Sequence, residues 1–197
     1  MKGIIFNTDM VKAVLEDRKS QTRRLITGHK LKMIQFNAFK DVAEHCPYGK
    51  VGDRLWVRHS FYHAFKGSYN EQVWDEFSKV LTFKNPPSEN DRPVCQYEID
   101  RELWKPNKKP SIHMPRWASR ITLEITDIRV ERVQSISLSD AYREGMINNC
   151  CNGQDCGCQG EMPISNFRNL WDSIYGKDAW ELNKHVWVIT FKVVTNG

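Results

Sequence analysis

The sequence contains no apolar run that approaches the ~18 residues needed to span a membrane. It also lacks a secretory signal, because the apolar stretch within residues 1–6 is too short and no small-residue cleavage site follows it. We therefore expect a cytoplasmic protein with no membrane partner. In that compartment the six cysteines are expected to be reduced thiols rather than disulfides.

Neither charge sign is in large excess. The 29 Lys and Arg residues oppose 24 Asp and Glu residues, which gives a net charge of +5. This balance is compatible with a polyanionic partner but does not by itself indicate one. Apolar residues make up 40% of the 197 residues, which excludes a disordered chain and is enough for one domain with its own core.

Hydrophobic periodicity predicts strands and a few separated helices, which together indicate an α+β fold around a small β-barrel. In the strongest strand signal, at 119–133, Ile121, Leu123 and Ile125 alternate with polar residues before the apolar face slips by one position. We expect a helix at 8–17 capped by Thr8 or Asp9, and another at 141–146 capped by Ser139 or Asp140. The other predicted elements are strands at 2–6, 24–26, 54–58, 94–99 and 187–194, a helix at 164–175, and a loop with partial helix at 29–46.

The run at 18–24 is rich in groups that can do chemistry. Threonine is a weak nucleophile until a base takes its proton, and a lysine serves as that base when burial or nearby cations lower its pKa. Lys19 and Thr22 fit these roles, and Arg23 and Arg24 can bind an anion through two parallel hydrogen bonds. The alternative is a basic surface loop that leads into a strand.

Glu144 lies in the last turn before Gly145. A carboxylate at that position can orient a lysine or relay a proton. The alternative is an ordinary solvated glutamate on a helix.

A cysteine-rich loop occupies residues 147–163. Four thiolates can hold zinc tetrahedrally, but zinc sites usually contain C-x2-C pairs, and adjacent cysteines do not easily ligate one ion together. The two alternatives are therefore a structural zinc that holds the loop together and a loop without metal. The candidate ligands are Cys150, Cys151, Cys156 and Cys158, whereas Cys46 and Cys95 are most simply small apolar residues.

Two segments interleave basic and aromatic residues, as nucleic-acid-binding surfaces do. If the segments lie side by side, they form one basic aromatic wall. The alternative is that the tryptophans cover an end of the barrel while the arginines pair with carboxylates. The first segment contains Arg54, Trp56, Arg58 and His59, and the second contains His113, Arg116 and Trp117.

Three of these pieces together resemble the ASCH domain, a branch of the PUA-like superfamily. They are the helix with the run at 18–24, the segment Val-Gly-Asp-Arg-Leu-Trp-Val at 51–57, and Glu-Gly-Met at 144–146. The segments at 47–49 and 112–120 resemble more narrowly the longer ASCH proteins of bacteriophages and prophages. The resemblance covers most of the chain and is weakest over 60–110 and 147–163.

The resemblance implies a single ASCH-like domain over residues 1–197, a PUA-like small β-barrel with packed helices and insertions at about 59–110 and 147–163. Its cleft would accept a nucleoside or RNA. Small bacterial members deacetylate N4-acetylcytidine without a cofactor, and their Lys, Thr and Glu correspond to Lys19, Thr22 and Glu144. Other members are RNA-binding modules or ribonucleases; His59 and His113 are candidate bases for the latter. The sequence does not indicate an oligomeric state.

Overall fold

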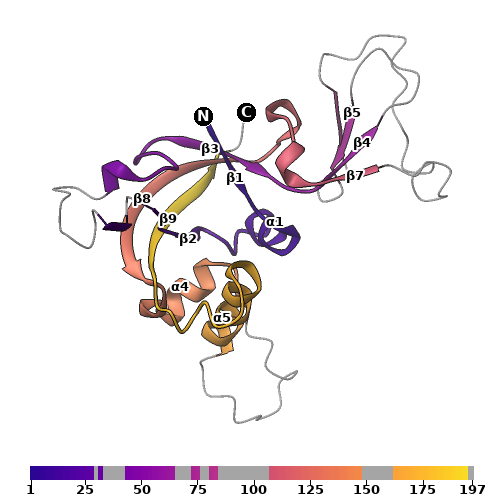
Figure 1. The fold of residues 1–197 in the computed structure, drawn as a ribbon. Coiled ribbons are helices and arrows are strands. Elements are labelled where there is room, and N and C mark those ends of the chain that lie inside the picture. Colours follow the sequence, from indigo (N-terminus) through magenta and orange to yellow (C-terminus); the bar gives the residue numbers. More distant parts are fainter. Residues whose placement is uncertain are drawn as a thin grey trace, which may run out of the picture.

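A computed structural model describes residues 1–28, 31–32, 43–64, 72–75, 80–83, 107–147 and 162–194. Its main element is a five-stranded sheet in the order β1-β3-β8-β9-β2 (Figure 1). β1 runs parallel to β3, and the other neighbours are antiparallel. The strands are β1 (Lys2–Ile5), β2 (Gln21–Leu25), β3 (Arg54–Arg58), β8 (Thr122–Arg132) and β9 (His185–Val194).

The alternating pattern predicted most of this sheet correctly. The slip in the apolar pattern of β8 corresponds to a β-bulge, because the register with β9 shifts between Ile125 and Asp127. β2 begins three residues earlier than predicted, at Gln21, so that Thr22 lies inside a strand rather than in a loop.

The predicted barrel is wrong, because the sheet stays open. Closure needs the two edge strands, β1 and β2, to pair with each other. Helix α1 (Thr8–Leu15) instead connects them and packs its buried residues Met10, Val11 and Val14 into the concave side (Figure 1). The edges are linked by a side chain, since Arg24 donates a hydrogen bond of 2.6 Å to the Ile5 carbonyl.

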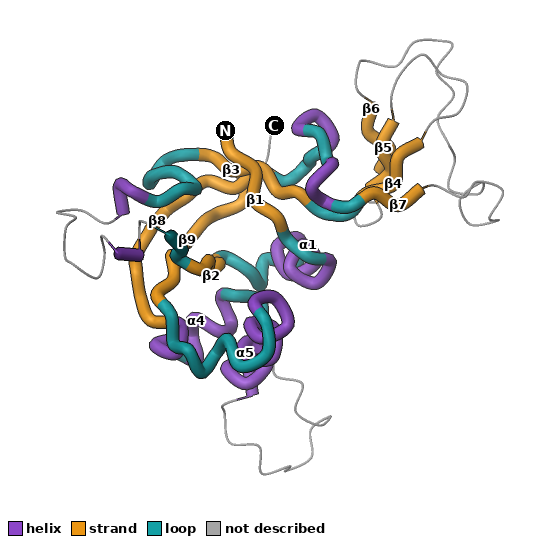
Figure 2. The backbone as a smooth tube through the Cα atoms, viewed as in Figure 1, coloured by secondary structure: helices purple, strands orange, loops and turns teal. Residues whose placement is uncertain are grey.

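A second, four-stranded antiparallel sheet falls within the range predicted as the first insertion. Its order is β6-β5-β4-β7, and Figure 2 shows it at one side of the five-stranded sheet. The strands are β4 (Phe61–Ala64), β5 (Gln72–Asp75), β6 (Val80–Phe83) and β7 (Asn107–Lys109). The strand predicted at 94–99 and most of the cysteine-rich loop lie outside the described residues.

The other helices are α4 (Leu138–Arg143) and α5 (Met162–Tyr175). The helix ends differ from prediction, since Asn7 caps α1 and Ser137 caps α4. Each cap side chain accepts a hydrogen bond from the amide three residues on, at 2.8 Å and 3.1 Å respectively, which is the usual geometry for an N-cap. Within the described ranges, no helix has the length and apolar character to cross a membrane.

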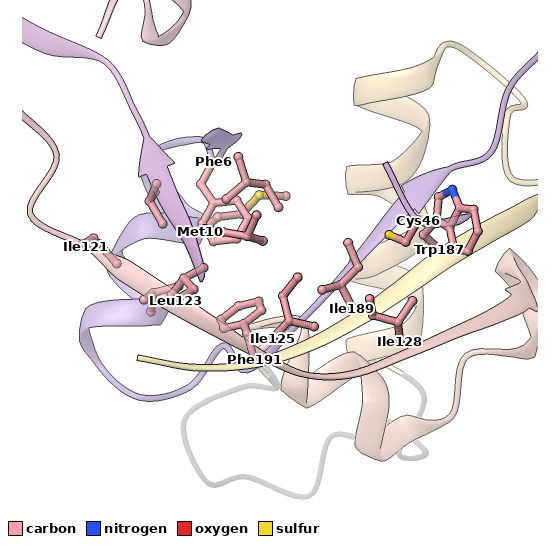
Figure 3. Close-up of a cluster of buried hydrophobic side chains, with 14 of the residues drawn as sticks. Phe6, Met10, Cys46, Ile121, Leu123, Ile125, Ile128, Trp187, Ile189 and Phe191 are labelled. Atoms are coloured by element: carbon pink, nitrogen blue, oxygen red, sulfur yellow. The ribbon is translucent and has the colours of Figure 1, made fainter. Parts of the chain in front are cut away.

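The hydrophobic core has two main parts. The larger lies between the concave face of the sheet and α1, and includes Phe6, Leu123, Ile189 and Phe191 (Figure 3). Cys46 is buried there, which confirms its prediction as a small apolar residue. The second cluster packs α4 and α5 around Trp171 against β9. Both parts meet near β2, so the residues of this strand are held on two sides.

Candidate functional site

Lys19 is placed by the way α1 ends. Asp17 adopts a left-handed conformation with φ of 54°, and the amides of Arg18 and Lys19 both donate to the Ala13 carbonyl at 2.8 and 2.9 Å. The chain then turns back, and Lys19 forms an isolated antiparallel bridge with Glu144. The end of α1 and the end of α4 are thus joined through their main chains.

The Lys19 ammonium is fully buried and has three hydrogen-bond acceptors. Nζ donates to the Gln21 carbonyl at 2.8 Å, to the Glu144 carbonyl at 2.8 Å and to Glu144 Oε2 at 2.9 Å. The exposed fractions of the two side chains are 0% and 2%. These contacts satisfy every N–H of a protonated lysine. None of the described contacts joins Nζ to the Thr22 hydroxyl.

Burial lowers the pKa of Lys19, because desolvation disfavours its charged form. The Glu144 carboxylate acts in the opposite direction, and the nearby guanidinium groups of Arg24 and Arg23 lower the pKa further. The result is a lysine whose pKa lies below its ordinary value even though it faces a carboxylate. Such a group can exchange its proton more readily than a surface lysine.

The Arg23 side chain, expected to bind an anionic ligand, contacts protein carboxylates instead. Its guanidinium lies 3.3 Å from Glu144 Oε1, 3.1 Å from Glu131 Oε2 and 3.0 Å from Asp140 Oδ2. Arg129 extends the cluster, with Nε 2.5 Å from Glu131 Oε1 and Nη2 3.2 Å from Asp140 Oδ1. Arg129 also lies 3.6 Å from Asp127 Oδ2, so the cluster consists of Lys19, Arg23, Arg129, Asp127, Glu131, Asp140 and Glu144.

Asp140 shows how charges are balanced in this cluster. Its partial burial acts to raise the pKa of the carboxyl group, but Arg23, followed by Arg129, outweighs that effect and holds the pKa below its ordinary value. Asp140 is therefore a stable anion that fixes the other side of the Arg23 guanidinium. Arg23 in turn positions the Glu144 carboxylate against Lys19.

Thr22 and Glu144 line one small cavity beneath α5. Its volume is about 10 Å3, roughly the room for one water molecule. A second cavity of about 200 Å3 lies between α1 and the end of α4, and Met10, Leu170 and Glu144 line both. Lys19 lines neither cavity and lies behind Glu144. Glu144 therefore contacts Lys19 and shares a cavity with Thr22, whereas no described contact joins Lys19 to Thr22.

The predicted basic aromatic residues lie elsewhere. Leu55 and Val57 of β3 are in the core with α1, so the alternation of the strand turns Trp56 to the opposite face. There the guanidinium carbons of Arg58 and Arg116 lie 5.3 and 5.9 Å from the centre of a Trp56 ring. The two segments come together there, on the face of the sheet opposite the core.

The remaining predicted residues on this side fall into two groups. Arg54 and His113 are exposed, whereas Trp117 is half-buried and packs with Trp56 on a small cluster around Met114. His59 is buried, and its Nδ1 donates to the Ser60 carbonyl at 2.8 Å. Neither histidine is among the lining residues of the two cavities near Thr22, so the ribonuclease alternative stays a prediction.

The predicted zinc ligands Cys150, Cys151, Cys156 and Cys158 lie outside the described residues, and the zinc site stays a prediction. Across the part of the chain that is described, no group of three or more His, Cys, Asp or Glu side chains has the arrangement of a metal site.

Sequence reasoning missed the carboxylates that support Arg23. A signal was present, because Asp127, Arg129 and Glu131 alternate along β8 and so share one face of the strand. It also did not predict why Gly145 is a glycine: its φ is 91°, and a Cβ there would lie 2.8 Å from the Ala13 Cβ. The close approach of α1 and α4 at the Lys19–Glu144 bridge therefore requires glycine at this position.

Comparison with known proteins does not assign the chain to a family. No protein-family model and no curated protein matches it. One similar solved structure is the high-resolution crystal structure of an ASCH domain from Lactobacillus crispatus JV V101. The two are 12% identical, the match covers 99% of this chain and 80% of the other, and the TM-score is 0.37. A likeness of this size assigns neither a family nor an activity.

Proposed function

We propose that the chain is an amidohydrolase of a small acylated nucleoside, N4-acetylcytidine or a close relative, with Lys19, Thr22 and Glu144 as its working residues. The observation that carries the proposal is the buried Lys19–Glu144 pair at 2.9 Å, with Thr22 and Glu144 lining one cavity. The motif resemblance to ASCH amidohydrolases gives these same residues the same roles. The competing explanation is a purely structural ion pair.

The chemistry follows from the properties of the three groups. The Thr22 hydroxyl attacks the acyl carbon, and its proton passes to the neutral amine of Lys19. Collapse of the tetrahedral intermediate breaks the carbon–nitrogen bond, and the leaving amine takes a proton from the Lys19 ammonium. A water molecule then hydrolyses the threonine ester, which releases the carboxylic acid and restores the hydroxyl.

Lys19 must turn for this step, because in the described conformation its Nζ donates to Gln21 and Glu144 rather than facing Thr22. Loss of one proton removes one of these three donors and leaves a lone pair free to accept from the hydroxyl. Glu144 holds the lysine in place before and after the transfer. Arg23 is a positioning residue here, since it acts on the reaction through Glu144.

The two cavities suggest how the substrate lies. The pyrimidine ring occupies the cavity of about 200 Å3 between α1 and α4, and the acyl group points toward Thr22. Because the space at Thr22 holds only one water molecule, Met10 and Leu170, which line both cavities, must move apart to admit the acyl group. Met10, Met146 and Leu170 provide apolar walls for a planar ring, while Asn7 and Asp9 provide polar edges. This pattern of apolar walls with few polar groups is typical of small-molecule sites.

The direct test incubates the purified protein with N4-acetylcytidine and measures cytidine and acetate by chromatography. We expect release by the wild type, loss of release with Thr22→Ala, and partial release with Thr22→Ser, which keeps a hydroxyl. Thr27→Ala is the matched control, because Thr27 is exposed just beyond β2. The proposal fails if the wild type releases no cytidine, or if Thr22→Ala releases it at the full rate.

A further inference from the structure

Three residues of β3 form a row on the face of the sheet away from the core. Arg54, Trp56 and Arg58 occupy alternate positions of one strand, so their side chains leave the same face. At roughly 3.3 Å per residue, the row extends for about 13 Å. A row of this length is longer than a single phosphate group and can contact several successive units of an extended polymer. With Arg116, these residues make up what we call the outer basic face.

Two arginines of this face are held in place by neutral groups, so no carboxylate balances their charge. Arg58 donates from Nε to the Ser111 carbonyl at 3.1 Å and from Nη2 to the Ile112 carbonyl. Arg116 donates to the Ser119 carbonyl at 3.4 Å and contacts the Met1 sulfur. All these partners are neutral. Both guanidinium groups are therefore ordered before any ligand arrives.

Arg58 and Arg116 form no ion pair within the described part of the chain. Arg54 lies opposite Glu124 of β8, but the Glu124 carboxylate is paired with Lys192 at 2.8 Å. Arg23 on β2 differs, since it contacts three carboxylates. Its charge is balanced by the protein itself, whereas the charges of Arg58 and Arg116 are available to an anion.

Trp56 adds an aromatic surface between the cations. The ring is half-buried and is supported from below by β1, where a Cβ at Gly3 would come within 3.0 Å of the Trp56 Cε2 atom. The short helices η2 (Ser111–His113) and η3 (Arg116–Ala118) carry the carbonyls and Arg116 that flank it. An indole fixed beside two ordered guanidinium groups is the arrangement that binds a base next to its phosphates.

We propose that the outer basic face binds a single-stranded nucleic acid, with phosphates at Arg54, Arg58 and Arg116 and one base against Trp56. The shared chemistry is that of the phosphodiester backbone with unpaired bases, and RNA and DNA are the two sources. This site lies on the opposite face of the sheet from the proposed reaction site. Binding is therefore independent of Thr22.

The test measures fluorescence anisotropy of labelled 12-nucleotide single-stranded RNA, single-stranded DNA and duplex DNA over a range of salt concentrations. We expect the wild type to bind the single strands more tightly than the duplex. The double variant Arg54→Gln/Arg116→Gln should lower affinity about ten-fold or more at low salt. It should also reduce the slope of log K against log salt by about 1.4, since each phosphate contact contributes about 0.7 for single strands.

The matched control is Lys177→Gln/Lys184→Gln, which removes the same charge from exposed positions beyond α5 and before β9. It should keep the wild-type slope. Trp56→Leu should weaken binding about ten-fold, and Trp56→Phe should restore part of it, because phenylalanine keeps an aromatic ring for stacking. Circular dichroism of each variant verifies that it is folded.

Three results would overturn the proposal. The first is a wild type that binds none of the three probes with a dependence on salt. The second is an equal loss of affinity in the double variant and its control, which means that net charge alone governs binding. The third is equal affinity for single strands and duplex. Thr22→Ala should leave the affinity for each nucleic-acid probe unchanged. The outcome of the binding test therefore does not depend on the outcome of the amidohydrolase assay.

Discussion

Lys19 and Glu144 are joined both through their main chains and through their side chains. They form an antiparallel bridge, and Lys19 Nζ donates to both the carbonyl and the carboxylate of Glu144 at 2.8 and 2.9 Å. The two residues are 125 positions apart in the chain. A pair tied so closely can serve the fold, the chemistry or both, and variants can separate these roles.

Glu144→Gln should destabilise the protein by about 3–5 kcal/mol, because it leaves the buried Lys19 ammonium without its compensating charge. Urea unfolding measures this loss. The double variant Lys19→Met/Glu144→Gln should recover most of the stability, since the uncompensated charge is gone, but it should release no cytidine from N4-acetylcytidine. Activity in a stable double variant would contradict a chemical role for the pair.

Gly145→Ala should destabilise the protein by about 1–3 kcal/mol from backbone strain alone, with a further cost from contact with Ala13. The φ of Gly145 is 91°, and a Cβ there would lie 2.8 Å from the Ala13 Cβ. Gly176→Ala is the control, because Gly176 has φ of 106° but open space around it. Urea unfolding should show a larger loss for Gly145→Ala; equal losses would mean that the close approach is unimportant.

Stability should fall in acid through Asp140. Its folded pKa is held below the unfolded value of about 3.9, so its contribution is fully present above that value and is lost as pH falls through the folded pKa. Asp140→Asn should cost about 1–2 kcal/mol at pH 7 and flatten the stability curve below about pH 5. Urea unfolding at several pH values measures the free energy of unfolding and its dependence on pH, with Glu44→Gln, a change at an exposed position, as the control. If the free energy of unfolding of Asp140→Asn falls in acid as steeply as that of the wild type, this account is contradicted.

The pH dependence of turnover should report Lys19. Because the neutral amine is the base, kcat/KM should rise with pH through a pKa below the ordinary lysine value of 10.5. Arg24→Gln removes a cation that lowers this pKa, so the rise should move to higher pH. Lys12→Gln, an exposed change on α1, should leave the profile in place. A profile that Arg24→Gln does not shift would argue against Lys19 as the titrating base.

Acyl size should govern substrate choice. The cavity beside Thr22 holds only about 10 Å3, so N4-benzoylcytidine should have kcat/KM at least about ten-fold below N4-acetylcytidine. Leu170→Ala, which removes a side chain lining both cavities, should narrow this difference. The control is Leu15→Ala, since Leu15 is 49% exposed. If the ratio of kcat/KM for the two substrates is the same in the wild type and in Leu170→Ala, the acyl group does not bind beside Leu170.

Local patterns predicted the strands well because alternation is a property of neighbouring residues. The long strand β8 was predicted with its slip, which the bulge between Ile125 and Asp127 explains. The barrel was predicted wrongly because closure depends on whether β1 meets β2, and no local pattern contains that information. Helix caps were misplaced by one to three residues, since several polar residues near each end can serve as caps.

The sequence could not assign partners to the arginines. Arg23 and Arg58 look alike in the chain, but one meets carboxylates from β8 and α4 while the other meets only carbonyls of η2. That difference arises from contacts 53 to 121 residues apart. The sequence also left open whether the two basic aromatic segments lie side by side, and the structure places the guanidinium carbons of Arg58 and Arg116 5.3 and 5.9 Å from the centre of a Trp56 ring.

The position of β2 has a consequence for how the protein is made. β2 carries Thr22 and lies at the edge of the sheet beside β9, the last strand of the described chain. A chain still growing on the ribosome therefore contains Lys19 and Thr22 early, yet β2 has no partner strand until residues 186–190 have been made. Chains cut short before that point leave β2 unpaired, so we expect them to lack an ordered site around Thr22.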